Sequence, residues 1–370
     1  MIEAIYEQWY FHRVDLARSL LATLFEGTGD PIALMGERRI GKTSFLVKDL
    51  IPAAHARGMV SVYVDIWQQR HDPLVAINYA LQEAIDDLEV PTTKTARRLA
   101  TTIKKIGLAG GSIDFGDEPI RKRPDSPYVL IDWLLKSLLR AAGKPVLLVF
   151  DEIQELATVK DGENIVSALR SAITKSRAYV RVIFTGSSEA ALMELLSRSR
   201  AALYEGASRI AFPRLDEKFI QFVAKTAKAR LGRMIAEKDL QTAFERLHHR
   251  PRPLIDLVLL FASTGRGKGI ATLLDDQVEA QLDSPEYGQQ WQTLKPLYRL
   301  ICERIARGDE VSSMAALQAY GAKGAAVSPG TVSSALRALQ TMHVTVRNAG
   351  QRGSYRLDDP LFAEWIRRKR

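Results

Sequence analysis

GERRIGKTS occupies residues 36–44, and this stretch decides the fold. It fits the pattern G-x-x-x-x-G-K-[ST] without a gap. An apolar run at 31–35 precedes it, and a helical pattern that starts at Phe45 follows it. In this setting, the backbone N–H groups of the loop and the positive end of the helix converge on one anion. The stretch therefore predicts a phosphate-binding loop.

The side chains of the loop have separate expected roles. We expect Lys42 to reach the β- and γ-phosphates of ATP and the Thr43 hydroxyl to bind Mg²⁺. Arg38 and Arg39 are bulky for such a loop, so we expect them to point outward, towards a partner, a second subunit or a lid. The positions expected to line the nucleotide are Gly36, Glu37, Arg38, Arg39, Ile40, Gly41, Lys42, Thr43 and Ser44.

A second motif, VLLVFDE at 146–152, ends an apolar strand with two carboxylates. Ligands of open α/β sheets bind at the carboxyl ends of the strands. We therefore expect Asp151 to hold Mg²⁺ together with Thr43 from two adjacent strand ends. Glu152 is expected to orient or deprotonate the attacking water, which favours ATP hydrolysis over binding alone.

The strand VRVIFT at 180–185 is followed by further polar side chains. Thr185, Ser187 or Ser188 could act as a sensor that contacts the γ-phosphate or the water. A serine at this position could equally cap the next helix, and the two roles are compatible.

Several arginines are candidates for stabilising the transferred phosphoryl group. Arg198, Arg200 or Arg209 could serve a neighbouring subunit, and a solvated surface position is the alternative for each. Arg250 and Arg252 flank Pro251, where a helical lid would meet the nucleotide. For these two, the alternative is an irregular basic turn.

The order of apolar patterns predicts three parts. Strands alternate with helices up to residue 212, which indicates a parallel sheet wrapped by helices, as in a P-loop NTPase. We expect this α/β core to span residues 1–215, with an insert at about 91–126. Purely helical patterns follow at 216–285, the expected lid. Residues 286–370 read as helix, helix, helix and a two-stranded wing, with the first helix at 291–307.

Composition limits the class of protein. The chain has 370 residues, a net charge of +9 and one cysteine, Cys302, which we expect to be a core residue. No apolar run is long enough to cross a bilayer and the N-terminus is unlike a signal peptide, so we expect a cytoplasmic protein without a membrane partner. The positive charge suits nucleic acid or a bound nucleotide and does not decide between them.

The motifs GERRIGKTSF, DEIQEL and FTGSS, with a helical lid and a C-terminal winged helix, resemble the archaeal-type ATPases. These belong to the AAA+-like and STAND P-loop ATPases, near the origin-recognition initiators. The resemblance implies Mg-ATP binding and a serine sensor. It also implies that the entry segment at 10–13, which ends in Arg13, packs near the adenine.

The sequence departs from this family at the lid turn. A Gly-Gly or His-x-Pro turn is usual there, whereas this chain has HRPRP at 249–253. By resemblance to the initiators, Arg252 could act as their second sensor. No effector domain follows, so the resemblance to STAND signalling proteins lacks its output module.

The expected winged helix carries basic residues on its recognition helix at 331–342, its wing and its tail. Such residues suit contacts with DNA phosphates, and a protein partner is the alternative. The polar and basic positions are Ser333, Ser334, Arg337, Arg347, Arg352, Arg356, Arg367, Arg368, Lys369 and Arg370.

Two functions remain open on this evidence. The first is an ATP-hydrolysing switch that binds duplex DNA and assembles with copies of itself. The second is a signalling or scaffold ATPase whose winged helix binds protein. A metabolic kinase is a weaker third reading, because no acceptor-substrate pocket is evident and a winged helix is appended.

Overall fold

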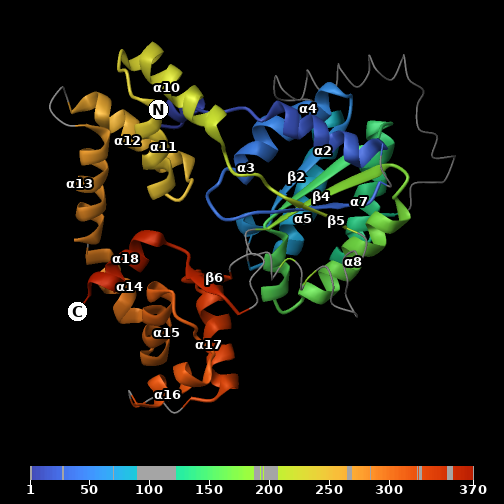
Figure 1. The fold of residues 1–370 in the computed structure, drawn as a ribbon. Coiled ribbons are helices and arrows are strands. Elements are labelled where there is room, and N and C mark those ends of the chain that lie inside the picture. Colours follow the sequence, from blue (N-terminus) through green and yellow to red (C-terminus); the bar gives the residue numbers. More distant parts are fainter. Residues whose placement is uncertain are drawn as a thin grey trace. The chain divides into compact units, whose positions relative to one another are not determined.

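The computed structural model describes most of the chain, and the chain divides into two compact units (Figure 1). One unit is Tyr10–Arg214, and the other combines Met1–Trp9 with Leu215–Arg370. The first nine residues, expected in the α/β core, thus group with the C-terminal unit. The described residues are 2–26, 29–69, 71–89, 122–186, 192, 195, 207–264, 269–283, 285–322, 324, 327–347 and 353–369.

The unit Tyr10–Arg214 is built on one parallel sheet with the strand order β2-β3-β4-β1-β5 among the described residues. Every residue of β3 is buried, as a strand covered on both faces requires. The strands are β1 (Ile32–Met35), β2 (Val60–Asp65), β3 (Val146–Asp151), β4 (Val180–Gly186) and β5 (Ser208–Ala211).

Helices cover both faces of this sheet (Figure 1). Leu148 and Phe150 of β3 pack in one cluster with the helices α5 (Pro73–Glu89), α7 (Pro127–Ala142) and α8 (Gly162–Lys175). The alternate residues, Leu147 and Val149, pack in a second cluster on the opposite face. The helices of that face are α2 (Val14–Glu26), α3 (Lys42–Phe45) and α4 (Ile51–Ala56). The predicted α/β fold class is confirmed.

The helix predicted to follow the loop is not uniformly α-helical. A π-helical turn, η1 (Leu46–Leu50), lies between α3 and α4. Short 3₁₀ helices follow β2 and β3, namely η2 (Ile66–Gln69) and η3 (Ile153–Thr158). Most of the expected insert, and most of the segment that follows β4 up to residue 206, lies outside the described residues.

The C-terminal unit is helical apart from one antiparallel strand pair. The helix predicted at 291–307 is two helices, because Pro296 excludes Lys295 from the helical region and leaves it extended, with ψ at 153°. The elements are α1 (Ile2–Glu7), α10 (Glu217–Leu231), α11 (Glu237–Arg246), α12 (Pro251–Ser263), α13 (Ile270–Leu282), α14 (Pro285–Thr293), α15 (Pro296–Arg307), α16 (Met314–Ala322), α17 (Pro329–Thr341), β6 (Thr345–Arg347), β7 (Tyr355–Leu357) and α18 (Pro360–Arg368).

Cys302 lies in the core formed by α14–α18 and the strand pair. Burial raises the pKa of its thiol to about 12, so the thiolate that a nucleophile requires is not formed near neutral pH. Within the described residues, no helix is both long enough and apolar enough to span a bilayer.

Candidate nucleotide-binding site

The loop between β1 and α3 has the backbone that the glycine pattern predicts. Gly41 takes the left-handed conformation, with φ at 93°, immediately before the helix begins. A Cβ at Gly36 would stand 3.0 Å from the Cβ of Phe212 and 3.0 Å from Cδ1 of Ile40. The first glycine is therefore required for close packing and the second for conformation.

The Lys42 ammonium points into its own loop. Its Nζ donates to the backbone carbonyls of Gly36 at 2.6 Å and Glu37 at 2.7 Å. Burial lowers the pKa of Lys42, and the charges of Glu152 and Asp151 partly oppose this effect. A buried cation among carbonyl groups is well placed to attract an anion into the loop.

Asp151 is the centre of a hydroxyl network at the carboxyl end of β3. Its side chain is buried, and Oδ2 accepts from the Thr43 hydroxyl at 2.7 Å and from the Tyr63 hydroxyl at 3.0 Å. Oδ1 accepts from the hydroxyl of Thr185, which is fully buried. Burial, followed by the charge of Asp151, raises the pKa of Tyr63. The network brings together residues from four elements.

Thr43 lies in α3, after β1, and Asp151 ends β3; these two strands are not adjacent, contrary to the sequence-based expectation. β4 lies between β1 and β3, in register with both. Thr185 of β4 therefore reaches Asp151 directly, so its described contact is with a carboxylate in the core. This placement makes Thr185 a support for Asp151, and its role as a sensor stays a prediction.

Glu152 follows Asp151 in an unusual backbone conformation. Its φ is 55°, in the left-handed region that disfavours side chains with a Cβ. Its backbone N–H donates to the Thr185 hydroxyl at 3.4 Å, and its Oε2 accepts from Nε2 of Gln154. Glu152 is thus held at both its backbone and its carboxylate.

Arg13 supports the loop through two hydrogen bonds and a ring contact. Its guanidinium donates to the carbonyls of Ile40 at 3.1 Å and Pro213 at 2.6 Å, and it stacks 4.3 Å from the centroid of the Phe212 ring. These contacts account for the described position of Arg13 without an adenine. A contact between Arg13 and the adenine remains a prediction.

The buried carboxylate of Asp49, in the π-helical turn, fixes the entry segment that contains Arg13. It accepts from the Tyr10 hydroxyl at 2.6 Å and from the Arg13 backbone N–H at 2.9 Å, and it pairs with Nδ1 of His12 at 2.6 Å. The segment is therefore attached to the helix that follows the loop.

Two further loop side chains have partners in the same unit. Glu37 forms an ion pair with Arg214 at 2.5 Å. The Arg38 guanidinium lies 5.5 Å from the centroid of the Trp67 ring, which is 41% exposed. Arg39 is exposed, and a contact of either arginine with a partner, a second subunit or a lid stays a prediction.

The other expected site residues are not gathered around this loop by described contacts. Arg209 is exposed on β5, at the edge of the sheet. Arg252 belongs to the C-terminal unit, where it stacks 4.5 Å from the Tyr6 ring centroid. Tyr6 also donates to Asp256, and this bond contributes most to raising the pKa of Tyr6. Four expected residues lie outside the described residues, namely Ser187, Ser188, Arg198 and Arg200.

The lid turn that departs from the family pattern is conformationally costly. His248 and His249 both have φ at 56°, in the region that glycine adopts without strain. His249 is held by an edge-on contact with the Phe244 ring, with centroids 5.1 Å apart. Arg250, which follows, donates to the carbonyl of Asp358 at 2.5 Å.

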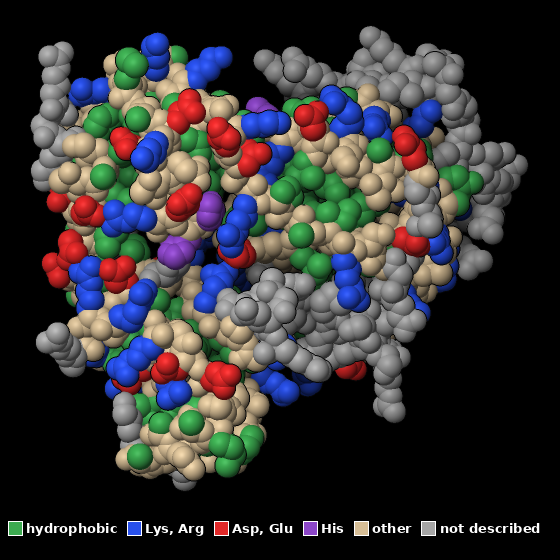
Figure 2. Space-filling model, in the orientation of Figure 1, with side chains coloured by type: hydrophobic (Ala, Val, Ile, Leu, Met, Phe, Trp, Pro, Cys, Tyr) green, Lys and Arg blue, Asp and Glu red, His purple; other side chains and the backbone are tan. Residues whose placement is uncertain are grey.

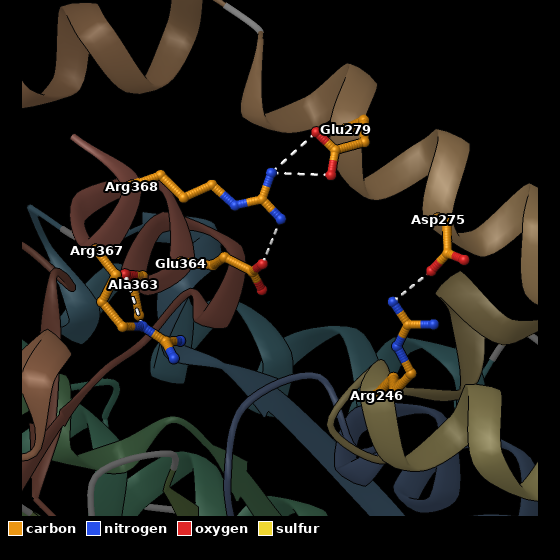
Figure 3. Close-up of polar contacts among 7 residues, drawn as sticks. All are labelled: Arg246, Asp275, Glu279, Ala363, Glu364, Arg367 and Arg368. Carbon is orange, nitrogen blue, oxygen red and sulfur yellow. Dashed lines mark hydrogen bonds and ion pairs between the residues drawn. The ribbon is translucent and has the colours of Figure 1, made fainter. Parts of the chain in front are cut away.

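Arg368 and Lys369 of the basic C-terminal tail have partners within the protein, and a contact of the tail with DNA stays a prediction. Figure 3 shows Arg368 between two carboxylates, with Nη1 2.8 Å from Oε1 of Glu279 in α13 and Nη2 2.7 Å from Oε1 of Glu364. Lys369 Nζ lies 4.9 Å from the ring centroids of both Trp291 and Trp365.

Basic and acidic side chains are mixed among the described residues of the visible face (Figure 2). Figure 2 shows Lys and Arg side chains interspersed with Asp and Glu. Arg337, Ser333 and Ser334 are exposed on α17, and Arg347 is exposed on β6 with a contact of 3.4 Å from its Nε to the Tyr355 hydroxyl. Arg352 lies outside the described residues.

Sequence analysis missed three residues that support the site. Tyr63 lies on β2, where its polar hydroxyl in a largely apolar strand was a usable signal. Gln154 lies two residues beyond the acidic pair, within reach of it. No sequence pattern indicated a role for Arg214, because only the fold shows that it forms an ion pair with Glu37.

Comparisons with known proteins agree with this geometry. A family model described as an ATPase domain predominantly from Archaea matches residues 10–257. A Walker-type ATPase of Pyrococcus abyssi is similar in structure, with a TM-score of 0.64 and 18% identity, and the match covers 97% of this chain and 96% of that one. No curated protein gives a significant match.

The ORC2 protein of Aeropyrum pernix is also similar in two structures. Its complexes with ADPNP and ADP give a TM-score of 0.54 at 16% identity, covering 95% of this chain and 91% of that one. Its ADP form gives 0.52 at 16% identity, covering 96% and 92%. These likenesses show the fold. Since the family model spans most of the chain and includes both motifs, the chain belongs to the family of ATPase domains found predominantly in Archaea, and the predicted ATPase is confirmed.

Proposed function

We propose that the chain is a Mg²⁺-dependent, ATP-hydrolysing switch that uses the loop at 36–44 and the acidic pair after β3. One observation carries the proposal. The Thr43 hydroxyl lies 2.7 Å from Oδ2 of Asp151, although the two residues belong to different motifs that follow the non-adjacent strands β1 and β3. A hydroxyl and a carboxylate at the mouth of an anion-binding loop are the pair that a nucleotide-bound cation requires.

The residues present fit magnesium. Mg²⁺ prefers hard oxygen ligands and is usually bound by one or two carboxylates together with substrate phosphates. Thr43 and Asp151 supply such oxygens, and the Asp151 carboxylate is already ordered by Thr185. When bound, the ion would neutralise charge on the phosphates.

The chain's own residues would perform the remaining steps. Lys42 would exchange its loop carbonyls for phosphate oxygens, and Glu152 would accept the proton of the attacking water. Ser187 or Ser188 would act as the sensor. Arg209 and Arg252 remain our proposals for charge supplied from a second subunit or from the lid.

Two substitutions test the proposal. Lys42→Ala should abolish binding of Mg-ATP, measured by calorimetry. Glu152→Gln should retain binding and lose phosphate release by roughly 100-fold or more, because the base is removed. The exposed residues Lys136 and Glu163 provide matched controls as Lys136→Ala and Glu163→Gln. Full hydrolysis by Glu152→Gln would contradict the assignment of the base.

We further propose that the C-terminal winged helix binds duplex DNA through α17 and the β6–β7 wing. The element order α15, α16, α17, β6, β7 supports it, as does the exposed face of α17 with Ser333, Ser334 and Arg337. Hydroxyl and guanidinium groups are common donors to phosphate. The alternative is a signalling ATPase whose winged helix binds protein.

Retardation of duplex DNA at low salt, with and without ATP, separates these functions. Salt-sensitive retardation that strengthens with ATP supports the DNA switch. No retardation at low salt, combined with nucleotide-dependent association with a protein, supports the alternative. Self-assembly and a cytoplasmic location stay predictions.

A further inference from the structure

Gln154 is a buried polar residue beside the proposed base, and neither motif assigns it a role. It lies in η3, two residues after Glu152, and is 3% exposed. Its Nε2 donates to Oε2 of Glu152. A donor to an ionised carboxylate forms one of the stronger side-chain hydrogen bonds in a protein.

The end of β4 confines the Gln154 amide. Gly186 is the last residue of β4, and a Cβ built there would stand 2.5 Å from Oε1 of Gln154. The next nearest atom to this added Cβ would be Cδ2 of Leu192, at 3.2 Å. A side chain at Gly186 would therefore displace the Gln154 amide from its observed position.

The backbone of Glu152 is restrained as well. Its left-handed conformation and its N–H bond to Thr185 determine the direction in which the side chain leaves the main chain. The bond from Gln154 then determines the orientation of the carboxylate. A base held in this way needs no reorganisation when the substrate binds.

We propose that Gln154 is a positioning residue that orients the Glu152 carboxylate to accept a proton from the attacking water, and that Gly186 leaves room for the amide. This inference rests on the proposed role of Glu152 as the base. It adds a residue that acts through Glu152 and contacts no phosphate.

Two variants remove the contact by different routes. Gln154→Leu keeps a side chain of similar length without the donor, and Gly186→Ala displaces the donor without changing its chemistry. Each should lower kcat roughly tenfold, the size of one hydrogen bond to a charged group, while the KM for ATP and the affinity measured by calorimetry stay unchanged. Gln221→Leu, at an exposed position of α10, is the matched control.

Combining variants distinguishes positioning from a structural role. If both act through one hydrogen bond, the double variant should be no slower than either single variant. In a Glu152→Gln background, Gln154→Leu should cause no further loss. Additive losses in kcat, or a further loss in that background, would show a structural role and overturn the inference. If Gln154→Leu does not fold, Gly186→Ala carries the test alone.

Failure of the inference and failure of the proposed function give different results. Unchanged kcat in both variants, with Glu152→Gln inactive, overturns the role of Gln154 and leaves the base in place. Normal hydrolysis by Glu152→Gln overturns the base and the inference together.

Discussion

Charged side chains have different surroundings in the two units of the chain. At the carboxyl edge of the sheet, Asp151 and Lys42 are buried and bonded to groups from several elements. In the C-terminal unit, the basic tail expected to face DNA is largely occupied by contacts within the protein, with Arg368 between two glutamates. Residue spacing therefore indicates which side chains meet at the first region, whereas a count of basic residues does not show which of them are already paired within the protein.

The largest expected effect tests the buried network. Asp151→Asn places an amide among hydroxyl donors and removes the charge expected to hold the cation, so kcat should fall by roughly 100-fold or more. Asp65→Asn is a matched control, because Asp65 is the register partner of Asp151 on β2. Steady-state phosphate release measures both. Equal losses of kcat in the two variants would mean that the Asp151 carboxylate contributes no more to hydrolysis than the Asp65 carboxylate does.

A smaller effect tests the basic surface. Arg337→Ala on the exposed face of α17 should weaken DNA binding and lower the slope of log affinity against log salt by about one. Arg368→Ala should leave this slope unchanged, because its guanidinium is already paired with Glu279 and Glu364. Fluorescence anisotropy across a salt series measures the slope. A comparable change with Arg368→Ala would show that the tail does contact DNA.

A third prediction sharpens the role of the hydroxyls around Asp151. Tyr63→Phe removes one donor to Oδ2 while Thr43 and Thr185 remain. The rate should fall roughly three- to tenfold, the size expected of one hydrogen bond to a charged group at a partly exposed site. Tyr79→Phe, at an exposed position of α5, should have no effect on phosphate release. An unchanged rate for Tyr63→Phe would remove Tyr63 from the site.

The smallest effect concerns stability. Burial, and then the charges of Asp151 and Glu152, raise the pKa of Asp65. The ionised carboxylate therefore destabilises the folded state above this raised pKa, and the penalty disappears as the pH falls below its ordinary value near 3.9. Asp65→Asn should raise the Tm by about 1–2 °C at pH 8, and by less as the pH is lowered towards 4. An increase in Tm that is the same at every pH would show that the raised pKa of Asp65 is not its cause.

Much of the fold was predictable because local patterns determine it. The apolar runs at 31–35 and 180–185 predicted β1 and β4 within one residue. Pro296 was visible in the sequence, yet the apolar period running through it concealed the break between α14 and α15. The strand order was not predictable, because the insertion of β4 between β1 and β3 depends on contacts distant in sequence.

The candidate site likewise combines residues that local motifs identify with residues that only the fold brings together. Lys42, Thr43 and Asp151 belong to motifs whose spacing carries their chemistry. Tyr63 and Thr185 contact Asp151 only because three strands align in one register, and no local pattern encodes that alignment. Residues that support a site are therefore harder to find from sequence than those that define it.

The placement of the first nine residues has a consequence for biosynthesis. Trp9 is 2% exposed, and Tyr6 bonds to Asp256, a partner 250 positions later. A chain emerging from the ribosome can complete the sheet as soon as residue 214 has left the exit tunnel, whereas the opening helix must wait for its partners. Translation therefore leaves Tyr6 without Asp256 while the intervening unit can already fold, so this contact belongs to the later steps of folding.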